Sequence, residues 1–97
     1  MIANKDIEML KNKHDVIALD RIMMRGSGSK SEDAAIALVE LDDPFMENDV
    51  WHFAMEDPDH HISSRFISVL ERSGNPVYHE LEETLLNRAY RNTHKAR

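Results

Sequence analysis

The sequence predicts an all-α protein, a small four- or five-helix bundle that folds as one domain over residues 1–97. Apolar residues recur at helical spacing along most of the chain. Three Asx-Pro pairs, Asp43-Pro44, Asp57-Pro58 and Asn75-Pro76, each place a side-chain acceptor at a helix N-cap and a proline at the first helical position. The chain has no cysteine, so packing rather than disulfide bonds must stabilise the fold.

The first helical segment is expected over residues 4–25, as one helix or as two collinear helices. Its apolar face is formed by residues spaced seven apart, namely Ile2, Met9, Val16 and Met23. Polar residues interrupt this face in the middle, where Asp15 is a suitable cap for a second helix. Residues 25–31 contain two of the three glycines and no apolar side chain, which predicts a mobile loop. This loop lacks the P-loop pattern, so a plain connector is the simpler interpretation.

Four further helices follow from local signals. Ser29 and Glu32 have the spacing of a capping box, which predicts a helix over residues 31–41. A short strand is the alternative there, but no partner strand is visible in the sequence. The Asx-Pro pairs predict short helices over about 44–56, 58–72 and 76–93. Helices joined by such short turns pack as neighbours.

Acidic residues are concentrated in the middle of the chain. Residues 1–30 carry six bases and four acids, residues 31–64 no base and ten acids, and residues 65–97 six bases and four acids, giving a net charge of −6. A net-negative protein is repelled by nucleic-acid backbones and by anionic membranes. We therefore expect no direct nucleic-acid or membrane partner, and instead a protein partner with a basic surface.

The sequence gives no sign of export or of a membrane span. No apolar run approaches the ~18 residues that a transmembrane helix needs. The first residues are charged throughout and lack the apolar core and cleavage site of a secretory signal. A cytoplasmic protein is the simplest expectation.

Seven residues are candidates for partner binding. Five are acids with no capping role, and two are apolar residues that lie together on a separate side of the helix at 44–56: Glu40, Asp42, Glu47, Asp49, Trp51, Met55 and Glu56. The Trp51 and Met55 pair indicates either a helix buried on two sides or an exposed anchor for a partner.

These observations favour a non-enzymatic protein that binds, and thereby inhibits or modulates, another protein through its acidic centre. A specific version is a nucleic-acid-mimicking inhibitor of the phage or mobile-element type, because ten carboxylates on one face would approach the charge density of DNA. The commoner alternative is a solvated acidic face that keeps the protein soluble.

A second hypothesis is a metal-binding protein or a metal-dependent enzyme. Its candidate ligands lie on one helical stripe and in the turn after it, namely His52, Glu56, Asp59, His60 and His61. No HExxH motif occurs, and acids and histidines near a helix start also serve as caps. Ser63 and Ser64 follow this histidine pair, but no nucleophile elbow surrounds them. We therefore expect no cofactor and no catalytic residue.

A third hypothesis is a homo-oligomeric assembly protein. The amphipathic N-terminal segment would then pack between subunits and bury Val16, Ile22 and Met23 there rather than in the monomer.

Overall fold

The computed structural model describes residues 4–26, 28–56 and 63–94. These ranges contain no strand, and the all-α class is confirmed for them. The helices are α1 (Asn4–Asn12), α2 (Val16–Arg25), α3 (Ser29–Leu41), the 3-10 turn η1 (Pro44–Met46), α4 (Glu47–Met55), α5 (Ser64–Arg72) and α6 (Pro76–His94). Six α-helices are thus present in the described ranges, more than the expected four or five. None of them is long and apolar enough to cross a bilayer.

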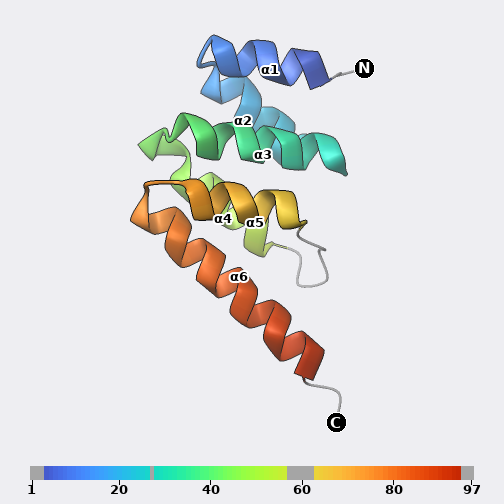
Figure 1. The fold of residues 1–97 in the computed structure, drawn as a ribbon. Helices are drawn as coiled ribbons and strands as arrows, with labels where there is room; N and C mark the ends of the chain where they lie inside the picture. The colour runs from blue at the N-terminus through green and yellow to red at the C-terminus, as the bar shows by residue number, and fades with distance from the viewer. Residues whose placement is uncertain (1–3, 27, 57–62, 95–97) are drawn as a thin grey trace.

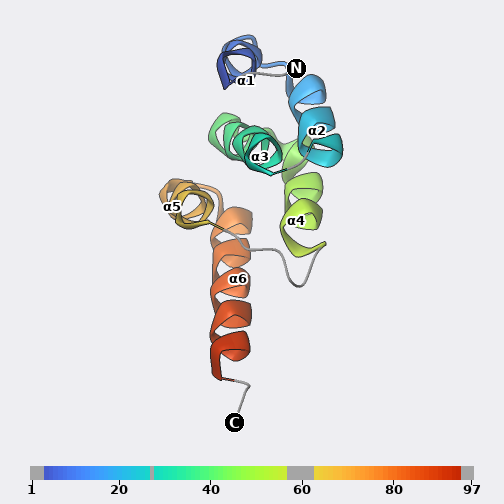
Figure 2. The same ribbon diagram turned by 90° about the vertical axis from the view of Figure 1, so that its right-hand side faces the viewer.

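The helices form two layers of three, stacked as consecutive pairs. α1, α3 and α5 lie side by side in one layer, and α2, α4 and α6 form the other (Figure 1; Figure 2). α3 is the central element because it packs against α1, α2, α4 and α5. The molecule measures 47 × 29 × 18 Å along its principal axes, so it is an elongated stack rather than a bundle closed around one axis.

The segment expected as one helix or two collinear helices is two helices that cross. His14 adopts a left-handed conformation with φ 55°, which turns the chain between α1 and α2. Asp15 then caps α2, because its Oδ1 accepts a hydrogen bond from the Ala18 N–H at 3.2 Å. Figure 2 shows the result, with α1 seen end-on and α2 running down the picture. The expected collinearity was wrong because a single left-handed residue redirects the chain.

The loop expected over residues 25–31 is shorter than predicted. α2 continues to Arg25 and α3 already begins at Ser29. Gly28, with φ 61°, occupies the N-cap position and provides no side-chain cap, so the capping box of Ser29 and Glu32 does not form. The Glu32 carboxylate instead accepts hydrogen bonds from Ser63 and Arg65 across the interface with α5.

Of the three helices expected after α3, the first two begin later than expected, whereas α6 begins at Pro76 as expected. Asp43 accepts a hydrogen bond from the Phe45 N–H at 2.8 Å, but the turn that follows is the 3-10 turn η1, and α4 starts only at Glu47. The Asp57-Pro58 pair lies outside the described residues. α5 starts at Ser64, not near residue 58, because the extended backbone of Ser63 precedes it. At the start of α6, Asn75 Oδ1 accepts from the Val77 N–H at 2.9 Å.

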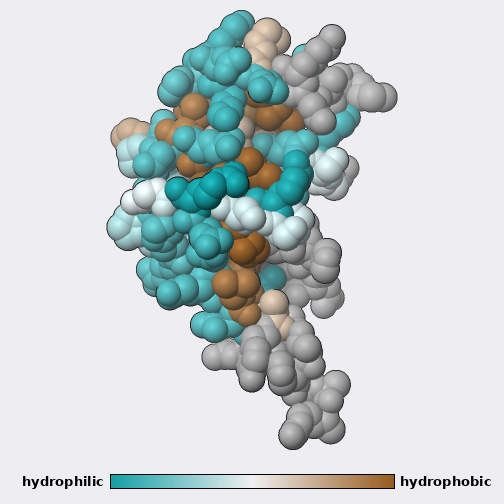
Figure 3. Space-filling model, viewed as in Figure 1, coloured by the Kyte–Doolittle hydropathy of each residue, from teal (hydrophilic) through white to brown (hydrophobic). Residues whose placement is uncertain are grey.

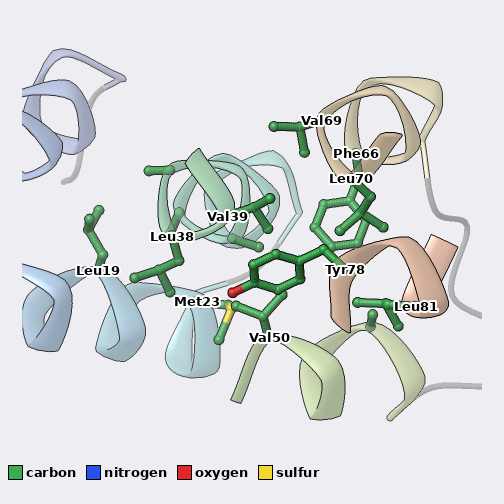
Figure 4. Packing of buried hydrophobic residues seen from close by; sticks show 14 of the residues in the cluster. Leu19, Met23, Leu38, Val39, Val50, Phe66, Val69, Leu70, Tyr78 and Leu81 are labelled. Carbon is green, nitrogen blue, oxygen red and sulfur yellow. The ribbon is translucent and has the colours of Figure 1, made fainter. Parts of the chain in front are cut away.

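The core lies where the two layers meet. Its largest fully buried side chains come from five helices, α2 to α6: Leu19, Met23, Leu38, Val39, Val50, Phe66, Leu70, Tyr78 and Leu81. Tyr78 reaches from α6 into the space beside Val39 and Val50, with its oxygen pointing toward Met23 (Figure 4). Burying these side chains holds successive helix pairs together, since each pair alone would leave one apolar face in water.

Candidate functional site

The chain changes direction sharply between α3 and α4, and acidic residues gather at this turn. Asp42 adopts the left-handed conformation, with φ 54° and ψ 47°, and its N–H closes the end of α3 by donating to Leu38 O and Val39 O. Asp43 follows as the cap of η1, and Glu47 opens α4. We call Asp42, Asp43, Phe45 and Glu47 the acidic corner.

Phe45 projects from the acidic corner into solvent. It is 85% exposed, the highest value among the large exposed apolar residues of the described chain. Phe45 is not among the residues that the sequence pattern predicted for partner binding. The available signal was that Phe45 falls outside the apolar stripe that carries Val50 and Ala54, both of which are buried. A phenylalanine exposed to this extent has no role in the core of the described chain.

Asn75 holds two carboxylates of the corner together. Its Nδ2 donates to Asp42 Oδ1 at 2.8 Å and to Glu47 Oε2 at 2.5 Å, while its Oδ1 caps α6. A neutral amide satisfies these carboxylates without adding a positive charge. The ends of α3, α4 and α6 are therefore fixed together and the corner keeps its negative charge.

The three carboxylates of the corner act on the same buried group. The pKa of the Tyr78 hydroxyl is raised, first by burial and then by the charges of Glu47, Asp42 and Asp43. The hydroxyl oxygen is buried and has no hydrogen-bond partner among the described residues. Tyr78 therefore stays protonated at all ordinary pH values, and the acidic corner contributes to this.

A groove of about 300 Å³ lies beside the corner, between the C-terminal ends of α3 and α5. Two of the predicted site residues, Glu40 and Asp42, line it together with Arg72. Glu40 also forms an ion pair with Lys11 at 2.6 Å on the neighbouring side of α3. Figure 3, which has the same view as Figure 1, shows hydrophilic side chains over most of the described surface, with apolar residues between them.

Asp49 faces α2 rather than the corner. Its carboxyl group interacts with that of Asp20 on α2. Burial, followed by the interaction with Asp49, raises the pKa of Asp20 to about 6. The two helices thus meet through a pair of carboxyl groups, which repel each other once both are ionised.

Trp51 and Met55 are half-buried and pack against the core. The Met55 sulfur also accepts a hydrogen bond from Arg88 Nη1 on α6 at 3.8 Å. Both residues therefore help to hold α4 in the stack. Glu56 directly follows α4 as its C-cap, where it is exposed and 3.9 Å from His52. The structure thus gathers Glu40, Asp42 and Glu47 near one corner. It places Asp49, Trp51 and Met55 elsewhere on α4 and Glu56 at the end of that helix.

The metal hypothesis rests largely on residues outside the described ranges, because Asp59, His60 and His61 lie there. Within the described part of the chain, no group of three or more His, Asp or Glu side chains is arranged to hold a metal ion. The remaining candidates, His52 and Glu56, form only the exposed pair just described.

The oligomer hypothesis placed Val16, Ile22 and Met23 between subunits. Met23 is only 1% exposed and belongs to the monomer core, so it is not available as an interface. Val16 and Ile22 pack against that core but are only partly buried, so each keeps some exposed surface.

The chain was compared with protein-family models, with curated proteins and with solved structures, and none of them matches it.

Proposed function

We propose that this chain is a non-enzymatic protein-binding module whose acidic corner docks on a basic surface of a partner protein. Phe45 is the anchor that enters an apolar pocket on that surface. The observation that carries this proposal is the 85% exposure of Phe45 beside the carboxylates of Asp42, Asp43 and Glu47. Aromatic anchors surrounded by polar groups dominate the binding energy of many protein interfaces.

The charge state of the corner supports the same proposal. Within the described residues, its three carboxylates contact only neutral donors, whereas Glu32, Asp33 and Glu40 already form ion pairs with Arg65 or Lys11. A lysine or arginine of a partner would therefore meet carboxylates that no cation of the described chain neutralises. Such attraction speeds association and weakens as salt is added.

Mimicry of nucleic acid receives less support than anchored docking. A mimic needs its carboxylates in a continuous row, but those of the described central region are divided among α3, the N-cap of η1 and α4. Several of them are also paired with cations. Inhibition of the partner remains part of the proposal, because a corner that occupies a basic site blocks it for other ligands.

The proposal is tested by placing a photo-crosslinking amino acid at position 45 and capturing partners from the native host. The control carries the same group at Leu86, which is 49% exposed on α6. A protein captured only through position 45 is then purified, and its affinity is measured by calorimetry. We expect Phe45→Ala to weaken binding by about tenfold or more, and added salt to weaken it further.

Leu86→Ala should bind that partner as the unsubstituted chain does. Equal affinities for Phe45→Ala and the unsubstituted chain would exclude Phe45 as an anchor. A competition experiment tests the nucleic-acid mimicry version separately. If the chain is a mimic, duplex DNA should displace it from the partner, and Phe45→Ala should have little effect on its affinity.

A further inference from the structure

The outward face of α2 is apolar and basic. Ile17 is 66% exposed and Met24 is 44% exposed, and Arg21 and Arg25 are exposed as well. At about 100° per residue these four side chains fall within a ~100° arc of the helix. Figure 2 shows that no described helix covers the side of α2 that faces away from α3. We call Ile17, Arg21, Met24 and Arg25 the α2 stripe.

The two arginines of the α2 stripe differ from Lys11 and Arg65 in their contacts. Lys11 and Arg65 each hold a carboxylate partner on α3. Arg21 and Arg25 form no ion pair with any described residue. Exposed apolar side chains beside unneutralised cations are suited to a surface that carries carboxylates around an apolar group.

The chain itself presents such a surface at its acidic corner. There one exposed aromatic ring lies beside three carboxylates that contact no described cation, the reverse of the α2 stripe in charge. Ile17 and Met24 are two helical turns apart, about 10 Å along the axis, which leaves room for one phenyl ring beside Arg21. We propose that the α2 stripe binds the acidic corner of a second copy of this chain, with Phe45 inserted between Ile17 and Met24.

Charge decides against the simpler symmetric contact. Two α2 stripes packed on each other would place arginines opposite arginines, and two acidic corners would place carboxylates opposite carboxylates. The proposed contact joins two different patches, so it is heterologous. An open row of copies keeps one free patch of each kind at its ends and can grow, whereas a closed ring keeps none. The size of this oligomer therefore increases with protein concentration and decreases with salt.

This inference goes beyond the proposed function, because it concerns the purified chain alone and a surface on α2. The two proposals share the acidic corner, so a bound partner and a second copy exclude each other there. Failure to self-associate would leave the partner proposal standing, since the crosslinking experiment tests that proposal separately.

The experiment measures mass by sedimentation velocity over a range of protein concentration and salt. We expect the average mass of the unsubstituted chain to rise with concentration and fall with salt. Arg21→Glu damages only the stripe and Phe45→Lys only the corner, and each should weaken association by about tenfold or more. Lys13→Glu is the matched control, because it reverses an exposed lysine in the turn after α1 with the same change in net charge. Circular dichroism verifies that all variants keep their helices.

Mixing the two damaged variants gives the sharpest outcome. Arg21→Glu keeps an intact corner and Phe45→Lys keeps an intact stripe, so an equimolar mixture should form dimers and nothing larger. The proposal is overturned if the unsubstituted chain stays monomeric at high concentration and low salt, or if Lys13→Glu reduces association as strongly as Arg21→Glu. It is also overturned if the monomer binds anionic lipid vesicles through Arg21, because the stripe would then belong to a membrane surface.

Discussion

Asn75 is the side chain on which the geometry of the acidic corner depends most directly. Its amide donates to Asp42 and Glu47 and also accepts from the Val77 N–H. An aspartate at this position could still cap α6, but it has no N–H to donate and would place a third carboxylate beside two others. The choice of Asn rather than Asp before Pro76 therefore has a physical reason that lies outside α6.

Replacing Asn75 with aspartate should destabilise the protein. We expect Asn75→Asp to lower the free energy of unfolding by about 2–3 kcal/mol, from lost hydrogen bonds and added repulsion. Urea denaturation measures this change. Asn48→Asp is the control, since Asn48 is exposed on α4 and the substitution adds the same charge. If the two variants were equally stable, Asn75 would not hold the corner together.

Asp20 should make stability depend on pH. Its pKa rises from 3.8 in the unfolded chain to about 6 in the folded protein, so the folded state binds the proton more tightly. The stabilising contribution of the protonated carboxyl is complete below pH 3.8 and is lost as the pH rises through about 6. We expect this loss to be of the order of 1–2 kcal/mol after solvent screening is considered.

Asp20→Asn tests this dependence because its amide resembles the protonated carboxyl at every pH. Thermal unfolding should show similar stability for both proteins in acid and greater stability for Asp20→Asn at neutral pH. A stability difference that stays constant across the range would show that the Asp20 and Asp49 pair does not titrate in this way.

At the scale of the element, the connection between α2 and α3 depends on a glycine. The Gly26 N–H donates to Ile22 O at 2.7 Å, and a Cβ at this position would lie 2.6 Å from that oxygen and 3.0 Å from Ser31 Oγ. The first of these atoms is backbone and cannot move aside without shifting the end of α2. Gly26 is therefore required for close packing of α2 on α3.

Gly26→Ala should lower the free energy of unfolding by about 1–3 kcal/mol because of this overlap. Gly74→Ala is the matched control, since a Cβ there meets no atom within 4 Å. It should be neutral or stabilising by up to about 1 kcal/mol, through reduced entropy of the unfolded chain. Thermal unfolding compares the two variants. Equal effects would mean that the chain near Gly26 relaxes around the added methyl group.

The elements also show what could be predicted from the sequence. Apolar spacing was sufficient to predict helices because it records which face each helix buries. The turns at His14 and Asp42 were not predictable, since neither residue type requires a left-handed conformation. Glu32 matched a local capping pattern, but its partners Ser63 and Arg65 are about thirty residues away and compete successfully for its carboxylate.

The candidate site, too, could be predicted only in part from the sequence. The sequence shows that acids are concentrated in the middle of the chain, but not which of them a cation neutralises, because Lys11 reaches Glu40 from a different helix. It also predicts that Trp51 lies on a separate side of its helix, but not that the stack packs around this side. Phe45 was missed because its exposure depends on the direction that α4 takes after the turn η1, which the sequence does not show.

At the scale of the whole molecule, the stack distributes stability unevenly. α3 contacts four other helices and contributes Leu38 and Val39 to the core. α1 lies at one end of the stack. Among its described side chains, Ile7 is the one that is buried in the core. In an array of stacked pairs each unit is stabilised mainly by its neighbours, so terminal units open more easily than central ones.

Amide hydrogen exchange should therefore be slowest in α3 and faster in α1. Ile7→Ala, which truncates a side chain that is only 5% exposed, should speed exchange in α1 without changing it in α5. Met9→Ala is the control because Met9 is 49% exposed on the same helix, and its loss should have little effect. If Ile7→Ala lowered protection equally in all helices, the molecule would unfold as one cooperative unit. In that case α1, and α2 with the α2 stripe, would not unfold separately from the helices that form the acidic corner.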